Sequence, residues 1–464
     1  MAERNSVQRC PAHQPRIFLP QIADGRAPRP TESMEDVAAC RRGPPMDPQP
    51  DPDRPNTSPT AGQGQVRLAD RTVSVSDLKQ HPDRYTGLFG RARSEVGHAV
   101  CLCRSDQEIR LVIRCRSGRY HLALWPAGGH QHDPGCSWYR SPSSMSGRST
   151  YEAAIRTTDD GTTIRLAAPL TLQGISTAPP ATPTAATPGS EQSVPTTRRS
   201  MGLLALLHYL WESAQLNVWH PHHGHRRWHT CQALLAEQAR DCRVNRTRLT
   251  DTLWIVPPFK SDHAERINAA WERFLNRLTI RGHTRHRGLV LGEIRNISPT
   301  DYGVRMSVAH QRAPLYASTQ LMDQARQSYP AVFSERAGEA GRRQVVLCLV
   351  ERARRGYPVI KEIAAMLTTH SYIPVESSHE ARMADALATA GRAFVKPLHY
   401  AGEDQVFPDF VLIDGDTETF VEVWGVQGRA DYEARKRAKQ DIYRATGRTL
   451  LEWDVRDPLP GLAR

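Results

Sequence analysis

The chain has 464 residues and carries 61 Lys and Arg against 49 Asp and Glu, a formal charge of +12 at pH 7. Apolar residues make up 39% of it, and no apolar run reaches the roughly 18 to 20 residues that a membrane helix requires. The first residues contain no hydrophobic signal segment, and nine cysteines are too few for a disulfide framework. These features argue against membrane-spanning and disulfide-rich secreted proteins, and we expect a cytoplasmic protein of about three domains.

The charge is unevenly distributed along the chain. Residues 201–370 carry a net charge of +10, whereas residues 371–464 carry −4. We therefore expect the middle region to contact nucleic acid and the C-terminal region to require a cation. Lysine is scarce, so the few lysines are informative; they are Lys79, Lys260, Lys361, Lys396, Lys436 and Lys439.

Composition and periodicity predict an α+β multidomain chain. The Pro-rich start lacks periodic apolar residues and is predicted to be disordered, and an Ala/Pro/Thr-rich stretch is predicted to be a linker. The predicted parts are a disordered lead (1–70), a zinc-binding β-rich module (71–175), the linker (176–200), a basic helical region (201–287), a mainly β region (288–370) and an α/β domain (371–464).

Two pairs of metal-ligand residues flank a hairpin predicted over residues 108–125. Cys101 and Cys103 precede it, and His132 and Cys136 follow it. Three thiols and one imidazole form a ligand set for tetrahedral zinc, and no position remains for water, so we predict a structural zinc site. The alternative is a set of ordinary buried cysteines beside a histidine-containing loop. Cys115, within a strand of the hairpin, is expected in the core.

The middle of the chain is predicted to begin with helices over residues 201–216, 231–242 and 264–278, and to become strand-like over residues 288–369. Its first part contains a histidine-rich segment with interleaved Arg and Trp. We interpret it either as a basic loop that touches phosphates or as an exposed, solvated loop. The histidines are His220, His222, His223, His225 and His229.

Two carboxylates occur on neighbouring strands predicted over residues 407–413 and 419–425. With the short connection at residues 414–417, Asp409 lies directly opposite Glu422. Cross-strand neighbours have Cβ atoms about 5 Å apart, so the two carboxylates repel unless a divalent cation or a proton lies between them. We predict a Mg²⁺ or Mn²⁺ site here. The alternative is that both are solvent-exposed strand residues.

Two further residues are placed near this pair by helical periodicity. Lys439 lies at the edge of the apolar face of a helix predicted over residues 430–446, where it can point inward, although a solvated basic face is an alternative. Glu380 lies near the start of a helix that follows Ser377. It is a candidate metal ligand, but Ser377 and Glu380 also match a capping box.

The order of Glu380 on a helix, Asp409 and Glu422 on consecutive strands and Lys439 on the next helix resembles the PD-(D/E)XK restriction-endonuclease-like superfamily. The resemblance implies a mixed sheet flanked by helices and Mg²⁺-dependent hydrolysis of phosphodiesters, with DNA as the expected partner. It implies catalytic roles for all four residues, with Asp409 and Glu422 as metal ligands. This sequence departs from the pattern at Trp424, which occupies the usual lysine position, and Lys439 resembles the migrated lysine of some members.

Residues 101–453 also resemble an uncharacterised bacterial family, domain of unknown function 1173. The resemblance rests on the Cys101/Cys103 and His132/Cys136 pairs, the 203–211 helix, and the segments Ile373-Pro374-Val375, Lys396-Pro397-Leu398 and Pro408-Asp409-Phe410. It implies a bacterial, often mobile-element-borne cytoplasmic protein. The leading hypothesis is a metal-dependent nuclease. The alternatives are a catalytically inactive nucleic-acid-binding protein and a zinc-stabilised adaptor.

Overall fold

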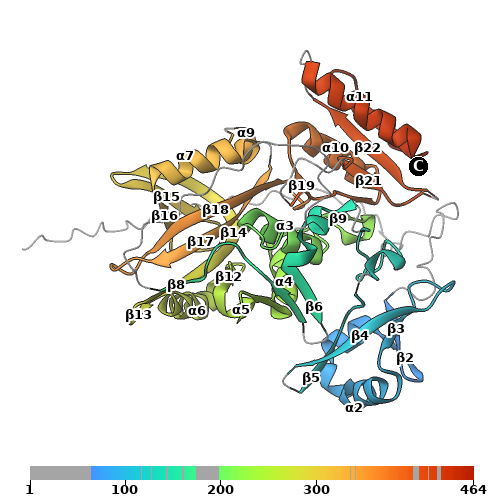
Figure 1. Ribbon diagram of the computed structural model, residues 1–464, viewed down its shortest axis with the longest axis horizontal. Helices are drawn as coiled ribbons and strands as arrows, with labels where there is room; N and C mark the ends of the chain where they lie inside the picture. Colours follow the sequence, from blue (N-terminus) through green and yellow to red (C-terminus); the bar gives the residue numbers. More distant parts are fainter. Residues whose placement is uncertain are drawn as a thin grey trace, which may run out of the picture. The chain divides into compact units, whose positions relative to one another are not determined.

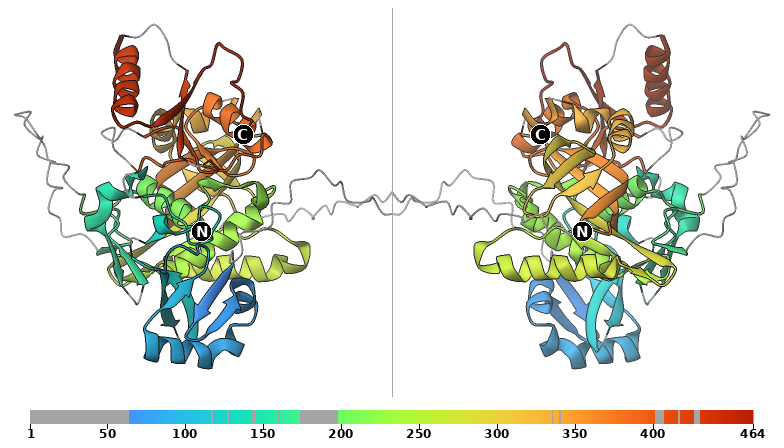
Figure 2. Two further views of the ribbon diagram at one scale, coloured as in Figure 1. Left: turned by 90° about the vertical axis from the view of Figure 1, so that its right-hand side faces the viewer. Right: turned by 90° about the vertical axis from the view of Figure 1, so that its left-hand side faces the viewer.

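The computed structural model describes residues 64–116, 118–126, 128–142, 145–158, 161–173, 198–334, 336–339, 341–400, 407–415, 417–425 and 430–463 (Figures 1 and 2). The chain divides into two units, Met1–Asn56 and Thr57–Arg464, and every described residue belongs to the second. The predicted lead up to residue 63 and nearly all of the predicted linker lie outside the described residues. Among the described helices, none is long and apolar enough to cross a membrane.

An antiparallel sheet forms the first described part of the chain. Its strands, in spatial order, are β2 (Arg71–Ser74), β1 (Gln65–Leu68), β3 (Ala99–Cys101), β4 (Ile109–Arg116) and β5 (Arg119–Leu124). Helices α1 (Val75–Gln80) and α2 (Thr86–Arg91) connect β2 to β3. Strands β4 and β5 form the expected hairpin. Strand β1 lies within the lead predicted to be disordered. The prediction is wrong for these residues, because the alternating residues Val66 and Leu68 are completely buried and hold the strand in the sheet.

Strands far apart in sequence meet in a second small sheet. Its order is β11 (Thr247–Arg248), β10 (Cys242–Val244), β7 (Gly161–Ile164) and β6 (Ile155–Thr158). Strand β10 pairs in parallel with β7. Hydrogen bonding thus joins the predicted zinc-binding module to the predicted helical region.

The largest sheet contains most of the middle region. Its main path is β12 (Leu253–Ile255), β14 (Thr284–Thr300), β15 (Gly303–Val308), β16 (Leu315–Ala317), β18 (Pro358–Thr368) and β17 (Arg343–Arg352), and β14 also pairs with β17. Three short strands pair at its margins, namely β8 (Thr171–Gln173), β13 (Ile280–Arg281) and β19 (Pro374–Val375). The centre of β17 is buried on both faces, which explains its unbroken apolar run from Val345 to Val350.

The C-terminal sheet is mixed. Its order is β23 (Thr449–Asp454), β22 (Thr419–Trp424), β21 (Phe410–Leu412), β20 (Phe394–Val395) and β9 (Val218–Trp219). Strands β22 and β23 are parallel, and the other pairs are antiparallel. Strand β9 comes from the predicted helical region, so this sheet also crosses a predicted boundary.

Helices cover these sheets close to their expected positions (Figure 1). Those before the largest sheet are α3 (Leu203–Ser213), α4 (Trp228–Arg240), α5 (Leu249–Thr252) and α6 (Ala264–Arg277). Those later in the chain are α7 (Thr319–Ser328), α8 (Pro330–Phe333), α9 (Arg336–Glu339), α10 (Ser378–Thr389) and α11 (Ala430–Ala445). The three helices α7–α9 interrupt the region expected to be strand-like.

Candidate functional site

The carboxylates predicted on the C-terminal strands lie beside each other. Strands β21 and β22 pair Phe410 with Val421 and Leu412 with Thr419, which is the register expected from the sequence. Asp409 immediately precedes β21, and its Oδ2 accepts a 2.7 Å hydrogen bond from the backbone N–H of Val423. This bond fixes the Asp409 carboxylate against the strand that contains Glu422.

Two side chains of helix α11 donate hydrogen bonds to the carboxylate of Glu422, a residue that is only 1% exposed. Lys439 Nζ lies 3.0 and 3.1 Å from the two carboxylate oxygens and also donates to the carbonyl oxygen of Phe407 at 2.9 Å. The hydroxyl of Tyr443 donates a 2.6 Å hydrogen bond to Glu422 Oε1. The inward-facing stripe of α11 thus places Lys439 at the acidic pair, and its catalytic role stays a prediction.

Glu380 caps its helix and also forms a buried ion pair. Its backbone N–H donates to Ser377 Oγ at 3.1 Å, and its Oε2 accepts from the backbone N–H of Glu376 at 3.0 Å. The same Oε2 lies 2.9 Å from Nζ of Lys396. The capping-box interpretation of Glu380 is therefore confirmed, whereas its role as a metal ligand stays a prediction.

Lys396 is the residue at this site that sequence reasoning missed. It is completely buried, and Nζ lies 3.6 Å from Glu376 Oε1 in addition to its contact with Glu380. A signal was present in the sequence, since one of only six lysines lies within the apolar run Ala393–Leu398. A lysine in such a run requires a buried anionic partner.

Burial and mutual repulsion alter the acidity of these groups. Burial raises the pKa of Glu380 to about 7 against the opposing effect of Lys396. Burial also raises the pKa of Asp409 to about 6, again opposed by Lys396 and reinforced by Glu422. Burial likewise raises the pKa of Glu422. Although burial acts in the opposite direction, the neighbouring carboxylates raise the pKa of Lys396. The buried carboxyl groups of this site therefore bind protons more readily than free carboxyl groups do.

Trp424 occupies the position two residues after Glu422. It is 5% exposed, and its indole N–H donates a 2.9 Å hydrogen bond to Glu452 Oε1. The ammonium group of Lys436 lies 4.9 Å from the centre of its ring. Trp424 is therefore a packed residue of the sheet, and Lys439 is the cation that reaches the Glu422 carboxylate.

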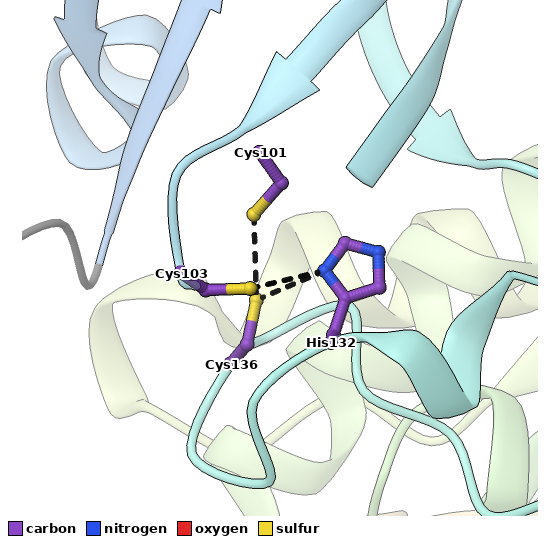
Figure 3. A group of neighbouring side chains, drawn as sticks. All are labelled: Cys101, Cys103, His132 and Cys136. Atoms are coloured by element: carbon purple, nitrogen blue, oxygen red, sulfur yellow. Dashed lines mark hydrogen bonds between the residues drawn. The ribbon is translucent and has the colours of Figure 1, made fainter. Parts of the chain in front are cut away.

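The predicted zinc ligands converge in the N-terminal part of the chain (Figure 3). All four are buried, and their ligand atoms lie within 4.8 Å of one another. Cys101 and Cys136 sulfurs are 3.7 Å apart, and His132 Nδ1 lies 3.5 Å from the sulfurs of both Cys103 and Cys136. Tetrahedral zinc with Zn–S of about 2.3 Å and Zn–N of about 2.0 Å requires edges of roughly 3.8 Å and 3.6 Å. The cluster can therefore hold a zinc ion.

The three cysteines are free thiols, and the 3.7 Å between the Cys101 and Cys136 sulfurs is too long for a disulfide, which requires about 2.05 Å. In the absence of metal, hydrogen bonds from Cys101 and Cys136 lower the pKa of the Cys103 thiol. Within the described part of the chain, this is the one group of three or more His, Cys, Asp or Glu residues with metal-ligand spacing. The acidic residues of the C-terminal site do not form such a group, and two of them are paired with lysines.

Cys115 and the histidine-rich segment 220–229 are two further features for which the sequence led to an expectation. Cys115 is exposed rather than buried in the core, because it lies next to the hairpin turn at the end of β4, beyond Ile113, the last residue of that strand in the apolar cluster. The histidines of the 220–229 segment are largely exposed, and the rings of His220, His222 and His223 contact one another. Their contact with phosphates stays a prediction.

A family model described as a protein of unknown function (DUF1173) matches residues 73–455. The chain belongs to this family. A search of curated proteins found no match. The match spans both the cysteine–histidine cluster and the acidic site, so both lie within the region that defines the DUF1173 family.

Proposed function

We propose that this DUF1173 protein is a metal-dependent nuclease. The observation that carries the proposal is the convergence of Glu380, Asp409 and Glu422 with Lys439 at 3.0 Å from Glu422. The mixed sheet and its flanking helices α10 and α11 support a restriction-endonuclease-like fold for residues 371–464. The basic central region supports DNA as the partner.

The chain's own residues supply defined parts of this chemistry. Asp409 and Glu422 would hold Mg²⁺ or Mn²⁺, with Glu380 as a third candidate, because hard cations prefer carboxylate oxygens. Such an ion supplies Lewis acidity and an acidified water molecule. The Val423 N–H orients Asp409, and the Tyr443 hydroxyl orients Glu422. Lys439 places positive charge where the scissile phosphate gains negative charge.

We further propose that the cysteine–histidine cluster binds one structural zinc ion. Its three thiols and one imidazole complete a tetrahedral set, so no open position exists for a substrate. The metal would tie the end of β3 to the loop that contains His132 and Cys136. This role is separate from the proposed cleavage.

Cleavage of plasmid and single-stranded DNA with and without Mn²⁺ tests the nuclease. We expect Mn²⁺-dependent cleavage that falls by at least about a hundredfold in Asp409→Asn and Glu422→Gln. Asp441→Asn is the matched control, because Asp441 lies on the exposed side of α11 and pairs only with Arg444 among the described residues. Cleavage by both site variants at the wild-type rate contradicts the proposal.

The burial of Trp424 at the usual lysine position favours a second candidate, a catalytically inactive nucleic-acid-binding or adaptor protein. In that case DNA binding depends on salt but not on divalent cations, and no cleavage accompanies it. The same assay separates the two candidates. Lys439→Met, which removes the ammonium group while leaving Trp424 in place, tests whether the lysine of α11 replaces the missing one.

A further inference from the structure

One face of the largest sheet carries a row of five paired residues on five strands, and two of these residues are arginines and one is a tyrosine. Strand pairing places Arg305 beside Tyr316, Tyr316 beside Val359, Val359 beside Glu351 and Glu351 beside Arg287. Side chains of paired residues share a face. We call this row the tyrosine–arginine face, and we include in it Arg285, two positions before Arg287 on β14, and Tyr357, which directly precedes β18.

Helix α3 packs against the part of this face that lies away from the β17–β18 turn. There Leu347, Leu349 and Ala364 lie in one apolar cluster with residues of α3. Towards the β17–β18 turn, Arg285, Arg305 and Tyr357 are exposed. On the opposite face of β15, Val304 and Met306 are buried in the cluster that contains residues of α7. The exposed part of the tyrosine–arginine face is therefore the part near the β17–β18 turn.

Two aromatic rings lie together on this face near the β17–β18 turn. The rings of Tyr316 and Tyr357 meet edge to face, with centroids 5.1 Å apart. Tyr357 is 42% exposed, and no hydrogen bond of its hydroxyl is found among the described contacts. A solvent-facing pair of rings on a sheet is a surface on which unpaired bases can stack.

Positive charge surrounds the rings. Glu351 is buried beneath Arg285 and Arg287, whose guanidinium groups lie 2.9 and 2.7 Å from its two oxygens. Lys361 Nζ lies 3.8 Å from the same carboxylate. Among the described side chains of this face, these three cations and Arg305 outnumber Glu351 and Glu362. The neighbouring turn adds the exposed residues Arg354 and Arg355.

We propose that the tyrosine–arginine face binds single-stranded nucleic acid. Bases stack on Tyr316 and Tyr357, and Arg305 and Arg285 contact the phosphates on either side. Charge complementarity selects a polyanion, and exposed rings select unpaired bases over a duplex, in which the bases stack on one another. The binding does not depend on cleavage, whereas its role as the substrate-holding surface rests on the proposed nuclease.

The position of the face is compatible with delivery of a strand to the acidic site. Strand β18 extends from Pro358, beside Tyr357, to Thr368, and β19 then leads to Glu376 and α10. At about 3.3 Å per residue, the length of β18 is roughly 30 Å. A substrate that occupies both places must therefore be several nucleotides long, so short oligonucleotides are expected to bind the face without being cleaved.

Fluorescence anisotropy with labelled oligothymidine tests the proposal, using the full chain without added divalent cations so that no cleavage occurs. We expect Tyr357→Ala to weaken binding roughly tenfold, and Tyr357→Phe to retain it because stacking needs the ring and not the hydroxyl. Arg305→Gln should weaken binding. It should also reduce the slope of log affinity against log salt concentration by about one, because one fewer counterion is released. Arg243→Gln, exposed on β10, is the control.

Three results would overturn the inference: wild-type affinity in Tyr357→Ala, equal affinity for a duplex of the same length, or displacement by polyglutamate as effective as by unlabelled oligothymidine. Circular dichroism shows whether each variant is folded. Loss of binding in Tyr357→Ala without any Mn²⁺-dependent cleavage in the wild type supports this surface and contradicts the nuclease. Cleavage with an unchanged KM in Tyr357→Ala supports the nuclease and contradicts this surface.

Discussion

Replacement of Lys396 by Met tests the electrostatic interpretation of the acidic site directly. The substitution keeps an apolar chain of similar length but removes the ammonium group that lies 2.9 Å from Glu380 and 3.6 Å from Glu376. Breaking a buried ion pair by removing one partner costs about 3 to 5 kcal/mol. We expect a loss of stability of that size at about pH 8, where the carboxylates are ionised.

The loss should depend on pH. Lys396 lowers the pKa of Glu380 and the pKa of Asp409. Its removal should therefore raise the pKa of Glu380 above about 7 and the pKa of Asp409 above about 6 in the folded state. A raised carboxyl pKa stabilises the folded state at low pH, and this contribution disappears as the pH rises through the folded value. The variant should therefore lose less stability at about pH 5, roughly 1.4 kcal/mol less per unit of pKa change at each group.

Urea unfolding of wild type and variant at both pH values measures this difference. Lys79→Met is the matched control, because Lys79 pairs with Glu237 at 3.5 Å with both side chains about half exposed, and its loss should cost less than about 0.5 kcal/mol. Adding Glu380→Gln to Lys396→Met should restore part of the stability. A loss below about 1 kcal/mol at pH 8, or one independent of pH, would refute the reasoning.

Three other predictions concern the metal cluster, a partly buried histidine and a packed glycine. Elemental analysis should find about one zinc per chain, which Cys136→Ser loses and the exposed Cys115→Ser retains; equal zinc in both variants contradicts the site. Burial lowers the pKa of His208 to about 4 from 6.5, and its Nδ1 donates to the carbonyl oxygen of His399. Stability should fall by up to about 3 kcal/mol as the pH drops from 6.5 to 4, and His208→Gln should reduce this loss in a pH series of unfolding curves. Gly288→Ala should cost about 1 to 3 kcal/mol by thermal unfolding, because a Cβ would lie 2.7 Å from Phe274 and 2.9 Å from Leu278; an unchanged melting temperature contradicts this packing.

The local features of the chain could be predicted from sequence because their causes are local. The β21–β22 register follows from a short connection, so Asp409 and Glu422 could be paired in advance. The periodicity of α11 placed Lys439 towards the sheet. Spacing also brought the two ligand pairs around the β4–β5 hairpin together, because a hairpin returns the chain to its starting point.

Only the tertiary structure decided which distant segments meet. Strand β9 joins the C-terminal sheet, and β10 joins β7, although no periodicity within a segment specifies its partner strand. Lys396 became recognisable as part of the site when β20 placed it between Glu376 and Glu380. The tyrosine–arginine face depends on the pairing of five strands separated by up to about 70 residues. The sequence determined the elements and their chemical groups, and long-range packing decided which of those groups lie together.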